Sequence, residues 1–372
     1  MARAGLRALA SGASGEARRK PERPRKILVL HELLLGDTLM LAPLLAALRA
    51  AHPEARLLVS APPAIAPLFA SRPYGVEVLA YSERAPGAWA ALQPARDADW
   101  VLLPGENRYA LQARALGARW IVGFAGAQPA WKDRLCDELV TFPREPAALA
   151  DMFALLSGAG AGVLDALRHH PQDWPAPPAE PFDGPQQPYA VLHVGAGSPL
   201  RLWAPERWQA LAGALAADGL APVWSAGPGE AHLVQAVDPQ GQHRAYPGTL
   251  SLPQLWRLLA GARLLVTLDT GIAHLAKLAG VPTAALFGPG SSVLFGRGRF
   301  WRASPYAELT VEAFPCRDQR HLFRREIAWV RRCNRGPDLC PQARCMQAIT
   351  VPAVLVAART LSASPSAHPP LL

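Results

Sequence analysis

The segment 268–289, LDTGIAHLAKLAGVPTAALFGP, holds the residues best suited to bind a charged ligand. Asp269, Thr270 and Gly271 lie where an apolar run gives way to a helical pattern, and the free N–H groups of such a helix start bind anions. Gly271 also leaves room for a diphosphate to approach the backbone. His274 follows one turn later; a buried helical histidine is more often a core residue, but the neighbouring Asp-Thr-Gly favours a role in binding. The segment therefore predicts a diphosphate site.

Two earlier segments also lie where an apolar run, expected to be a strand, gives way to a helical pattern. HVGAGSPLRLW (193–203) has small residues after an apolar run, and the planar guanidinium of its Arg201 suits phosphate. SAGPGE (225–230) ends in Glu230, an acid that could accept hydrogen bonds from a ribose. Taken alone, the first pattern also fits a surface loop and the second a plain helix start. Because ligands of parallel α/β sheets bind at such corners, the junctions could contribute to one site.

A fourth junction is Gly36-Asp37, at the start of another helical pattern. Asp37 can cap that helix, and for an isolated motif this is the more common role. If the residue lies at the lip of a cleft between domains, its carboxylate could instead act as a general base toward a hydroxyl.

The elements that must position these residues alternate between strands and helices. In the first half, short apolar runs predict strands at 26–31, 55–60 and 98–104, and periodic patterns predict helices at 37–50 and 110–116. The Pro-rich connector 171–188 cannot form regular structure. After it, strands are expected at 189–194, 221–227, 263–268 and 281–288, and helices at 205–217, 251–262 and 270–279. Such alternation implies parallel strands and right-handed crossovers, here in two α/β domains.

Composition agrees with a two-domain globular protein. The chain has 372 residues, of which 50% are hydrophobic and 18% charged. No apolar run reaches the length of a membrane-spanning helix, and the N-terminus lacks the pattern of a secretory signal. Five cysteines suit a reducing compartment. We therefore expect a cytoplasmic protein.

The net charge of +9 is concentrated in two segments. Residues 1–26 carry eight Lys/Arg against two Glu and are expected to be a disordered, solvated tail. Residues 316–345 carry eight Arg against three acids, either as a basic face or as a surface for phosphate-rich partners, including an anionic membrane. Within them, 317–332 is compatible with a helix having one apolar side, although packing of its apolar residues on the second domain is slightly favoured. RNA-stacking patterns are absent, so no nucleic acid is expected.

Together these motifs resemble glycosyltransferase family 9, which includes the ADP-heptose–lipopolysaccharide heptosyltransferases. The likeness rests on GDTLMLAPLLAALRAAHPEARL (36–57), HVGAGSPLRLWAPERWQALAGAL (193–215), SAGPGE, and the segment 250–289, and it covers roughly residues 26–357. It implies an α/β protein of GT-B architecture, with two Rossmann-like parallel-sheet domains facing a cleft. The expected division is a basic tail (1–25), an acceptor-side domain (26–180), a nucleotide-sugar-binding domain (185–357) and a Pro/Ser-rich tail (358–372).

The resemblance also implies roles for single residues. Asp37 resembles the catalytic base of the acceptor-side domain. Glu230 resembles the acid that binds the donor ribose, and Asp269 the residue that contacts the donor sugar. Arg201 stands where the family usually has a lysine, so the charge is kept while the geometry toward phosphate changes. The implied donor-binding set is Arg201, Glu230, Asp269, Thr270, Gly271 and His274.

The implied activity is hexosyl or heptosyl transfer with inversion and without a catalytic metal or other required cofactor. Heptose from ADP-heptose would pass to a hydroxyl of the lipopolysaccharide core or of another glycan or glycolipid, and peripheral membrane contact would fit such an acceptor. The alternatives are a nucleotide-sugar-binding protein without catalysis and a GT-B-like sugar epimerase. Asp97-Ala98-Asp99 has the Asp-x-Asp spacing of metal-dependent glycosyltransferases, but Asp99 directly precedes an apolar strand and is interpreted as structural.

The cysteines divide into one isolated residue and one group. Cys136 is expected to be a small core residue. Cys316, Cys333, Cys340 and Cys345 fall within thirty residues and could hold a structural zinc or iron ion. Many family members have a close pair where Cys316 and Cys333 are separated by sixteen residues, so a metal is slightly disfavoured here.

Overall fold

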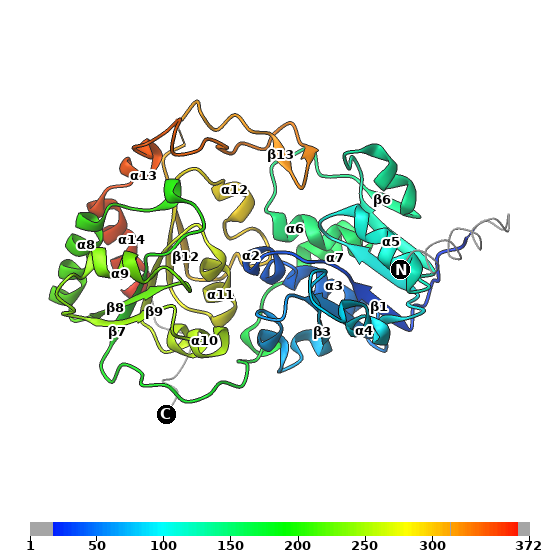
Figure 1. Ribbon diagram of the computed structural model, residues 1–372, viewed down its shortest axis with the longest axis horizontal. Coiled ribbons are helices and arrows are strands. Elements are labelled where there is room, and N and C mark those ends of the chain that lie inside the picture. Colours follow the sequence, from blue (N-terminus) through cyan, green and yellow to red (C-terminus); the bar gives the residue numbers. More distant parts are fainter. Residues whose placement is uncertain (1–17, 313, 364–372) are drawn as a thin grey trace. The chain divides into compact units, whose positions relative to one another are not determined.

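Two six-stranded sheets organise the protein (Figure 1). The computed structural model describes residues 18–312 and 314–363. Among the described residues, one compact unit, called here the first unit, comprises 18–167, Asp173–Pro175 and Arg320–Trp329; the others form the second unit. The expected boundary at 180–185 thus lies slightly earlier, and a short later segment returns to the first unit.

The first unit is a doubly wound parallel sheet. Its strand order is β3-β2-β1-β4-β5-β6, so the direction of winding reverses between β1 and β4. The central strands β1 and β4 are apolar and buried apart from Lys26 at the start of β1, as expected of a parallel sheet with helices on both faces. The strands are β1 (Lys26–Val29), β2 (Arg56–Ala61), β3 (Glu77–Ala80), β4 (Trp100–Leu103), β5 (Trp120–Phe124) and β6 (Glu138–Val140).

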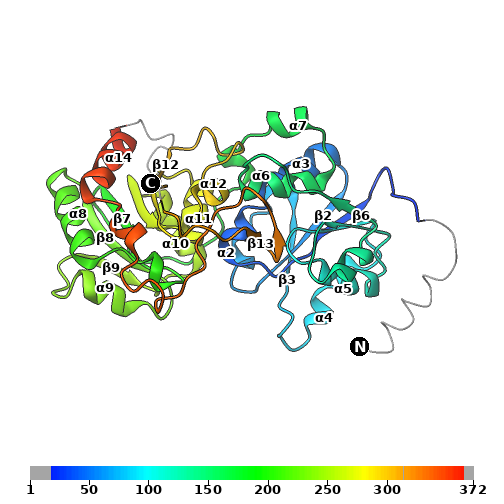
Figure 2. The ribbon, with the colours of Figure 1, turned by 90° about the horizontal axis from the view of Figure 1, so that it is seen from above.

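The helices of this unit are short, and one of them differs from expectation. They are α2 (Leu35–Leu39), α3 (Ala42–Ala51), α4 (Ala88–Ala91), α5 (Ala110–Ala115), α6 (Leu149–Ala154) and α7 (Ala161–Ala166). α3 packs beside α6 (Figure 2). The single helix predicted at 37–50 is broken into α2 and α3, because Pro43 has no N–H to donate to the carbonyl of Leu39 and its ring crowds that carbonyl.

The second unit repeats the architecture. Its order is β12-β11-β10-β7-β8-β9, with the reversal between β10 and β7. The strands are β7 (Tyr189–His193), β8 (Ala221–Ala226), β9 (Arg244–Pro247), β10 (Leu264–Leu268), β11 (Thr283–Phe287) and β12 (Tyr306–Thr310). All are parallel, so their carboxyl ends share one edge of the sheet.

Helices flank this second sheet. They are α8 (Pro205–Ala217), α9 (Ala231–Val237), α10 (Leu252–Ala260), α11 (Gly271–Ala279), α12 (Ser292–Phe295), α13 (Arg344–Gln347) and α14 (Val351–Ala363). α14 packs on α8 and on the strands β10 to β12 (Figure 2). The tail expected at 358–372 therefore begins too early: residues up to 363 are helical, with Ala358 and Leu361 buried. Residues 364–372 lie outside the described part.

The segment 317–332 is not the amphipathic helix that its pattern allowed. It contains an antiparallel hairpin of β13 (His321–Leu322) and β14 (Arg325–Glu326), which belongs to the first unit (β13 in Figure 1). Leu322 and Ile327 are buried. These apolar residues therefore pack inside the protein, but in the first unit and not on the second domain as expected. Peripheral membrane contact stays a prediction without their support.

The start of the described chain also departs from expectation. Lys20 pairs with Glu138, and the indole of Trp100 donates to the carbonyl of Pro21 at 2.9 Å. Residues 18–25 are therefore held on the first unit instead of forming a disordered tail, while 1–17 lie outside the described part. Asp99 accepts hydrogen bonds from backbone N–H groups where β1 begins, in agreement with its structural interpretation. Within the described chain, no helix has the length and apolar character required to cross a bilayer.

Candidate functional site

The start of α11 is the centre of the candidate donor site in the second unit. β10 ends at Leu268, and Thr270 caps α11 with its hydroxyl, which accepts from the N–H of Ile272 at 3.3 Å. Asp269 lies between strand and helix. Gly290, in the loop after β11, faces it so closely that a Cβ there would clash with the Asp269 carboxylate. Two neighbouring strand ends thus meet at this corner.

Arg201 reaches the same corner from the loop after β7. Its Nη1 donates to the Asp269 carbonyl at 2.7 Å and lies 3.8 Å from Asp269 Oδ2. Asp269 is 5% exposed, and this burial raises the pKa of its carboxyl despite the opposing charge of Arg201. Among the described residues, Asp269 Oδ2 has no hydrogen-bond partner. A buried oxygen of this kind can take a hydrogen bond from a ligand hydroxyl.

His274 is the second buried polar group at this helix start. Burial, reinforced by the charge of Lys277, lowers the pKa of its imidazole well below the ordinary value. The ring is therefore neutral near pH 7 and can exchange a hydrogen bond with a ligand without bringing a positive charge. Its Nδ1 finds no hydrogen-bond partner within the described chain.

Glu230 lies at the next strand end, directly before α9. Its Oε2 accepts from the N–H of Gly227 at 2.7 Å. A Cβ on Gly195, in the loop after β7, would clash with the same oxygen. The carboxylate therefore occupies a space that glycines leave open between two loops. Sequence reasoning missed Gly195 and Gly290, although each follows a buried strand, which was the available signal.

Asp37 lies in the first unit, in the short helix that follows β1. The helix cap is Leu34, so the expected capping role of Asp37 is wrong. Asp37 is half-buried in the first turn of α2, next to the point where the winding of the sheet reverses. His31, at the start of the same loop, accepts from the N–H of Leu33, and burial lowers the pKa of its imidazole to about 3.

A polar cluster at the ends of β4 and β5 was not anticipated. Lys132 is 5% exposed and lies 3.1 Å from Glu106. Arg325, from the hairpin, is 2% exposed and donates to Asn107 at 2.9 Å. These residues are far apart in sequence, and no local pattern links the hairpin to the strands, so sequence reasoning could not assemble them.

The possible metal site of the four C-terminal cysteines is not formed among the described residues. In the described ranges, no three His, Cys, Asp or Glu side chains are arranged to hold a metal ion. Burial raises the pKa of the Cys316 thiol, and the nearby Cys333 raises it further. Cys345 is buried against Gly288. The five cysteines, all in the described ranges, are free thiols. The hairpin between Cys316 and Cys333 replaces the short spacing that a compact thiolate site uses.

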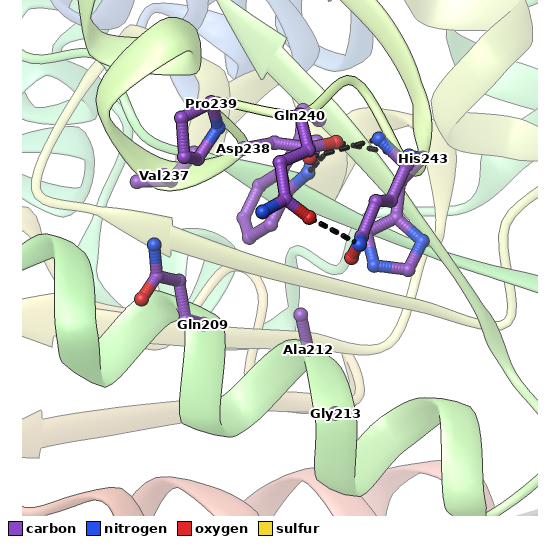
Figure 3. A pocket seen from close by; sticks show the side chains of 10 residues that line it. Gln209, Ala212, Gly213, Val237, Asp238, Pro239, Gln240 and His243 are labelled. Carbon is purple, nitrogen blue, oxygen red and sulfur yellow. Dashed lines mark hydrogen bonds between the residues drawn. The ribbon is translucent and has the colours of Figure 1, made fainter.

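A hollow of about 340 Å³ lies elsewhere in the second unit (Figure 3). It opens between α8 and the loop that leads into β9, where Asp238 accepts from the indole of Trp224 and the N–H groups of Gln242 and His243. The hollow lies near the amino end of β9, whereas Glu230 lies at the opposite, carboxyl edge of the same sheet. None of the predicted donor-binding residues lines it, so we do not assign the donor to this hollow.

Comparison with known proteins identifies the family. The model described as glycosyltransferase family 9 (heptosyltransferase) matches residues 95–321, more than half of the chain. Lipopolysaccharide heptosyltransferase 1 of Pseudomonas aeruginosa is 39% identical over 82 residues, which represent 20% of this chain and 23% of that protein. The aligned part thus spans less than a quarter of this curated relative.

Solved structures confirm the predicted fold. A family 9 glycosyltransferase of Veillonella parvula is 17% identical, with 92% of this chain and 99% of that chain covered at a TM-score of 0.69. The ADP-heptose lipopolysaccharide heptosyltransferase II of E. coli is 19% identical, with 91% and 98% covered at a TM-score of 0.66. Two Rossmann-like parallel sheets of the GT-B class are therefore established. Since the family model spans the whole second sheet and strands β4 to β6 of the first, this chain belongs to glycosyltransferase family 9.

Proposed function

We propose that this chain is an inverting glycosyltransferase that moves a sugar, heptose from ADP-heptose, to a glycan hydroxyl such as one of the lipopolysaccharide core. The observation that carries the proposal is the start of α11, where two buried polar atoms, Asp269 Oδ2 and His274 Nδ1, have no hydrogen-bond partner among the described residues. Both lie at a helix N-terminus suited to a diphosphate, and Arg201 is beside them. Glu230 supplies an acid for the ribose.

Departure of the nucleoside diphosphate requires stabilisation of its growing negative charge. The guanidinium of Arg201 and the free N–H groups at the start of α11 would supply it as donors already held in place. A neutral His274 could add a hydrogen bond. This donor set supports transfer without a catalytic metal, and we expect activity to persist in a chelator.

Asp37 is proposed as the base in the first unit. The acceptor oxygen would attack the anomeric carbon from the face opposite the diphosphate. The new C–O bond forms as the bond to the diphosphate oxygen breaks, and the hydroxyl proton passes to the Asp37 carboxylate. Its place at the switch point of the sheet, where ligands of such folds bind, supports this role.

The choice of donor and acceptor is taken from the names of similar proteins. The E. coli structure is named for ADP-heptose, and the P. aeruginosa relative for lipopolysaccharide. Extending both to this chain is part of the proposal.

A thermal-shift panel of ADP-, GDP- and UDP-sugars tests the donor assignment. A ligand at a hundred times its Kd stabilises the folded state by about 2.7 kcal/mol, so a clear rise in Tm is expected with the ADP-sugar. The same rise should appear with EDTA present. A rise with GDP- or UDP-sugar alone would overturn the ADP assignment, and no rise with any donor would overturn the site.

A further inference from the structure

The hairpin Arg320–Trp329 is anchored at the carboxyl edge of the first sheet. Its buried Arg325 donates through Nη1 to the Gly105 carbonyl at 2.8 Å, and through Nη2 to Asn107 Oδ1 at 2.9 Å and the Phe124 carbonyl at 3.1 Å. Gly105 and Asn107 follow β4, and Phe124 ends β5. One arginine thus ties the hairpin to two adjacent strand ends.

This anchor lies against the loop before α2, the short helix that contains Asp37. A Cβ on Gly105 would lie 3.0 Å from the side chain of Leu33, so little space separates the two loops. The hydroxyl of Thr38, the residue after Asp37, donates to the Leu33 carbonyl at 3.3 Å. The hairpin therefore borders the part of the first unit in which an acceptor hydroxyl would have to meet its base.

The turn of the hairpin is held in an unfavourable conformation. Phe323 and Arg324 both have positive φ, 47° and 60°, although such two-residue turns favour Asn and Gly. Each residue costs about 1 kcal/mol or more in this region unless its surroundings compensate. The Phe323 ring stacks on Phe153 with centroids 6.1 Å apart, and the side chain of Arg324 is 74% exposed. The fold thus fixes the backbone of the turn and leaves the Arg324 side chain exposed.

Positive charge exceeds its direct partners at this place. Lys132 and Arg324 lie 3.1 and 3.8 Å from the same carboxylate, that of Glu106. The hydrogen bonds of Arg325 go to uncharged oxygens, and its buried Nε has no partner in the described part of the chain. Lys132, Arg324 and Arg325 carry three positive charges, and among the described residues Glu106 is the acid that pairs directly with two of them. The excess of positive charge attracts an anion.

Asp133 is the other acid whose charge reaches Arg325. Its carboxylate already accepts from Asn107 Nδ2 at 2.7 Å and from the N–H groups of Gly126 and Ala127. It holds the loop after β5 and makes no ion pair with the three cations in the described structure. The Asp133 charge partly offsets that of Arg325, while the exposed side chain of Arg324 stays accessible to a ligand.

We propose that the hairpin forms a subsite that binds an anionic group, a phosphate or a carboxylate, on the acceptor glycan. Arg324 would be its specificity-determining residue. Arg325 and the buried Lys132 would position it, Arg325 by anchoring the hairpin and Lys132 by holding the Glu106 carboxylate beside Arg324. The inference rests on the proposed function only in taking the first unit as the acceptor side.

Calorimetry tests the subsite by measuring how the protein binds a delipidated, heptose-free lipopolysaccharide oligosaccharide. No sugar donor is present in this experiment. Arg324→Ala is expected to weaken binding roughly tenfold, the usual effect of losing one charged contact. Arg320→Ala removes the same charge from an exposed position on the same hairpin and should stay within about twofold of the wild type. Equal losses in both variants, an unchanged Arg324→Ala, or no binding by the wild type would each overturn the proposal.

A dephosphorylated oligosaccharide separates the two sources of charge. If phosphate is read, wild type and Arg324→Ala should bind it equally and weakly; if carboxylate is read, the difference between them should persist. Arg325→Met should loosen the hairpin, seen as faster amide exchange at 320–329, and weaken binding with it. Because no donor is present, failure of sugar transfer and failure of this subsite are observed separately.

Discussion

At the scale of single residues, burial decides which protonation states the donor site offers. Asp269 and His274 are both almost fully enclosed, and burial raises the pKa of the acid while it lowers that of the imidazole. Arg201 keeps a permanent charge beside them. A negative diphosphate would therefore meet the cation of Arg201 and a neutral imidazole, beside a carboxyl whose negative charge is disfavoured by burial.

Asp269→Asn should weaken donor binding while the protein remains folded. The amide keeps the shape of the side chain but replaces an acceptor oxygen that has no partner in the described chain. Loss of a charged hydrogen bond costs about 1.5–3 kcal/mol, so calorimetry should show roughly ten- to hundredfold weaker affinity for ADP-sugar. His274→Ala should act in the same direction. Unchanged affinity in both variants would remove the donor site from this helix start.

Asp37→Asn should abolish most turnover without changing donor affinity. Removal of a general base typically lowers the rate by about 10²- to 10⁴-fold. Steady-state transfer and calorimetry on the same preparation separate the two effects. Glu54→Gln changes an exposed acid between α3 and β2 and serves as the control. Its turnover and donor affinity should equal those of the wild type. Near-normal turnover by Asp37→Asn would refute the assignment of the base.

At the scale of elements, the loops after the strands matter through the space that they leave. Gly195→Ala would push its methyl group into the Glu230 carboxylate, whose flexible side chain would have to turn away. We expect ADP-sugar affinity to fall about tenfold or more, with little loss of stability. Gly197→Ala, two residues along the same loop, has open space around its Cβ and is the matched control. Equal affinity in the two variants would argue against a ribose contact by Glu230.

Strands and the donor corner were predictable because their signals are local. Apolar runs mark buried parallel strands, and the helix expected at 205–217 has those bounds in the structure. The break between α2 and α3 was predictable in principle from Pro43, but the periodic leucines on either side favoured one helix. The hairpin was not predictable, because its stability comes from Arg325 and strand ends two hundred residues earlier in the chain.

At the scale of the whole molecule, the sequence likewise does not show which distant segments pack into which unit. The Pro-rich connector indicated two domains, yet no pattern in residues 320–329 shows that they pack with the first unit. The cysteine group illustrates the same point. Close spacing in sequence suggested a shared ligand, whereas the hairpin between Cys316 and Cys333 directs the chain elsewhere.

Stability should depend on pH through three buried histidines distributed over both units. Burial lowers the pKa of His31 to about 3, that of His193 to about 4, and that of His274 well below 6.5. The unfolded chain binds protons on these rings below pH 6.5 while the folded protein does not, so stability is complete above 6.5 and falls toward pH 4. Each ring contributes at most about 1.4 kcal/mol per pH unit.

Melting temperatures between pH 7.5 and 4.5 check this expectation. His193→Gln should flatten the slope below pH 6.5, and His232→Gln, an exposed residue, should leave it unchanged. A Tm that stays constant from pH 6.5 to 4.5 in the wild type would show that these rings are protonated in the folded protein.

The most direct test of the central claim is acceptor-dependent sugar transfer, followed by NMR of the anomeric centre. The purified chain is incubated in EDTA with ADP-heptose and a heptose-free lipopolysaccharide. The account predicts release of ADP only when the acceptor is present, together with a glycosidic product of inverted anomeric configuration. ADP-heptose left intact in the presence of acceptor, or a product of retained configuration, would contradict it.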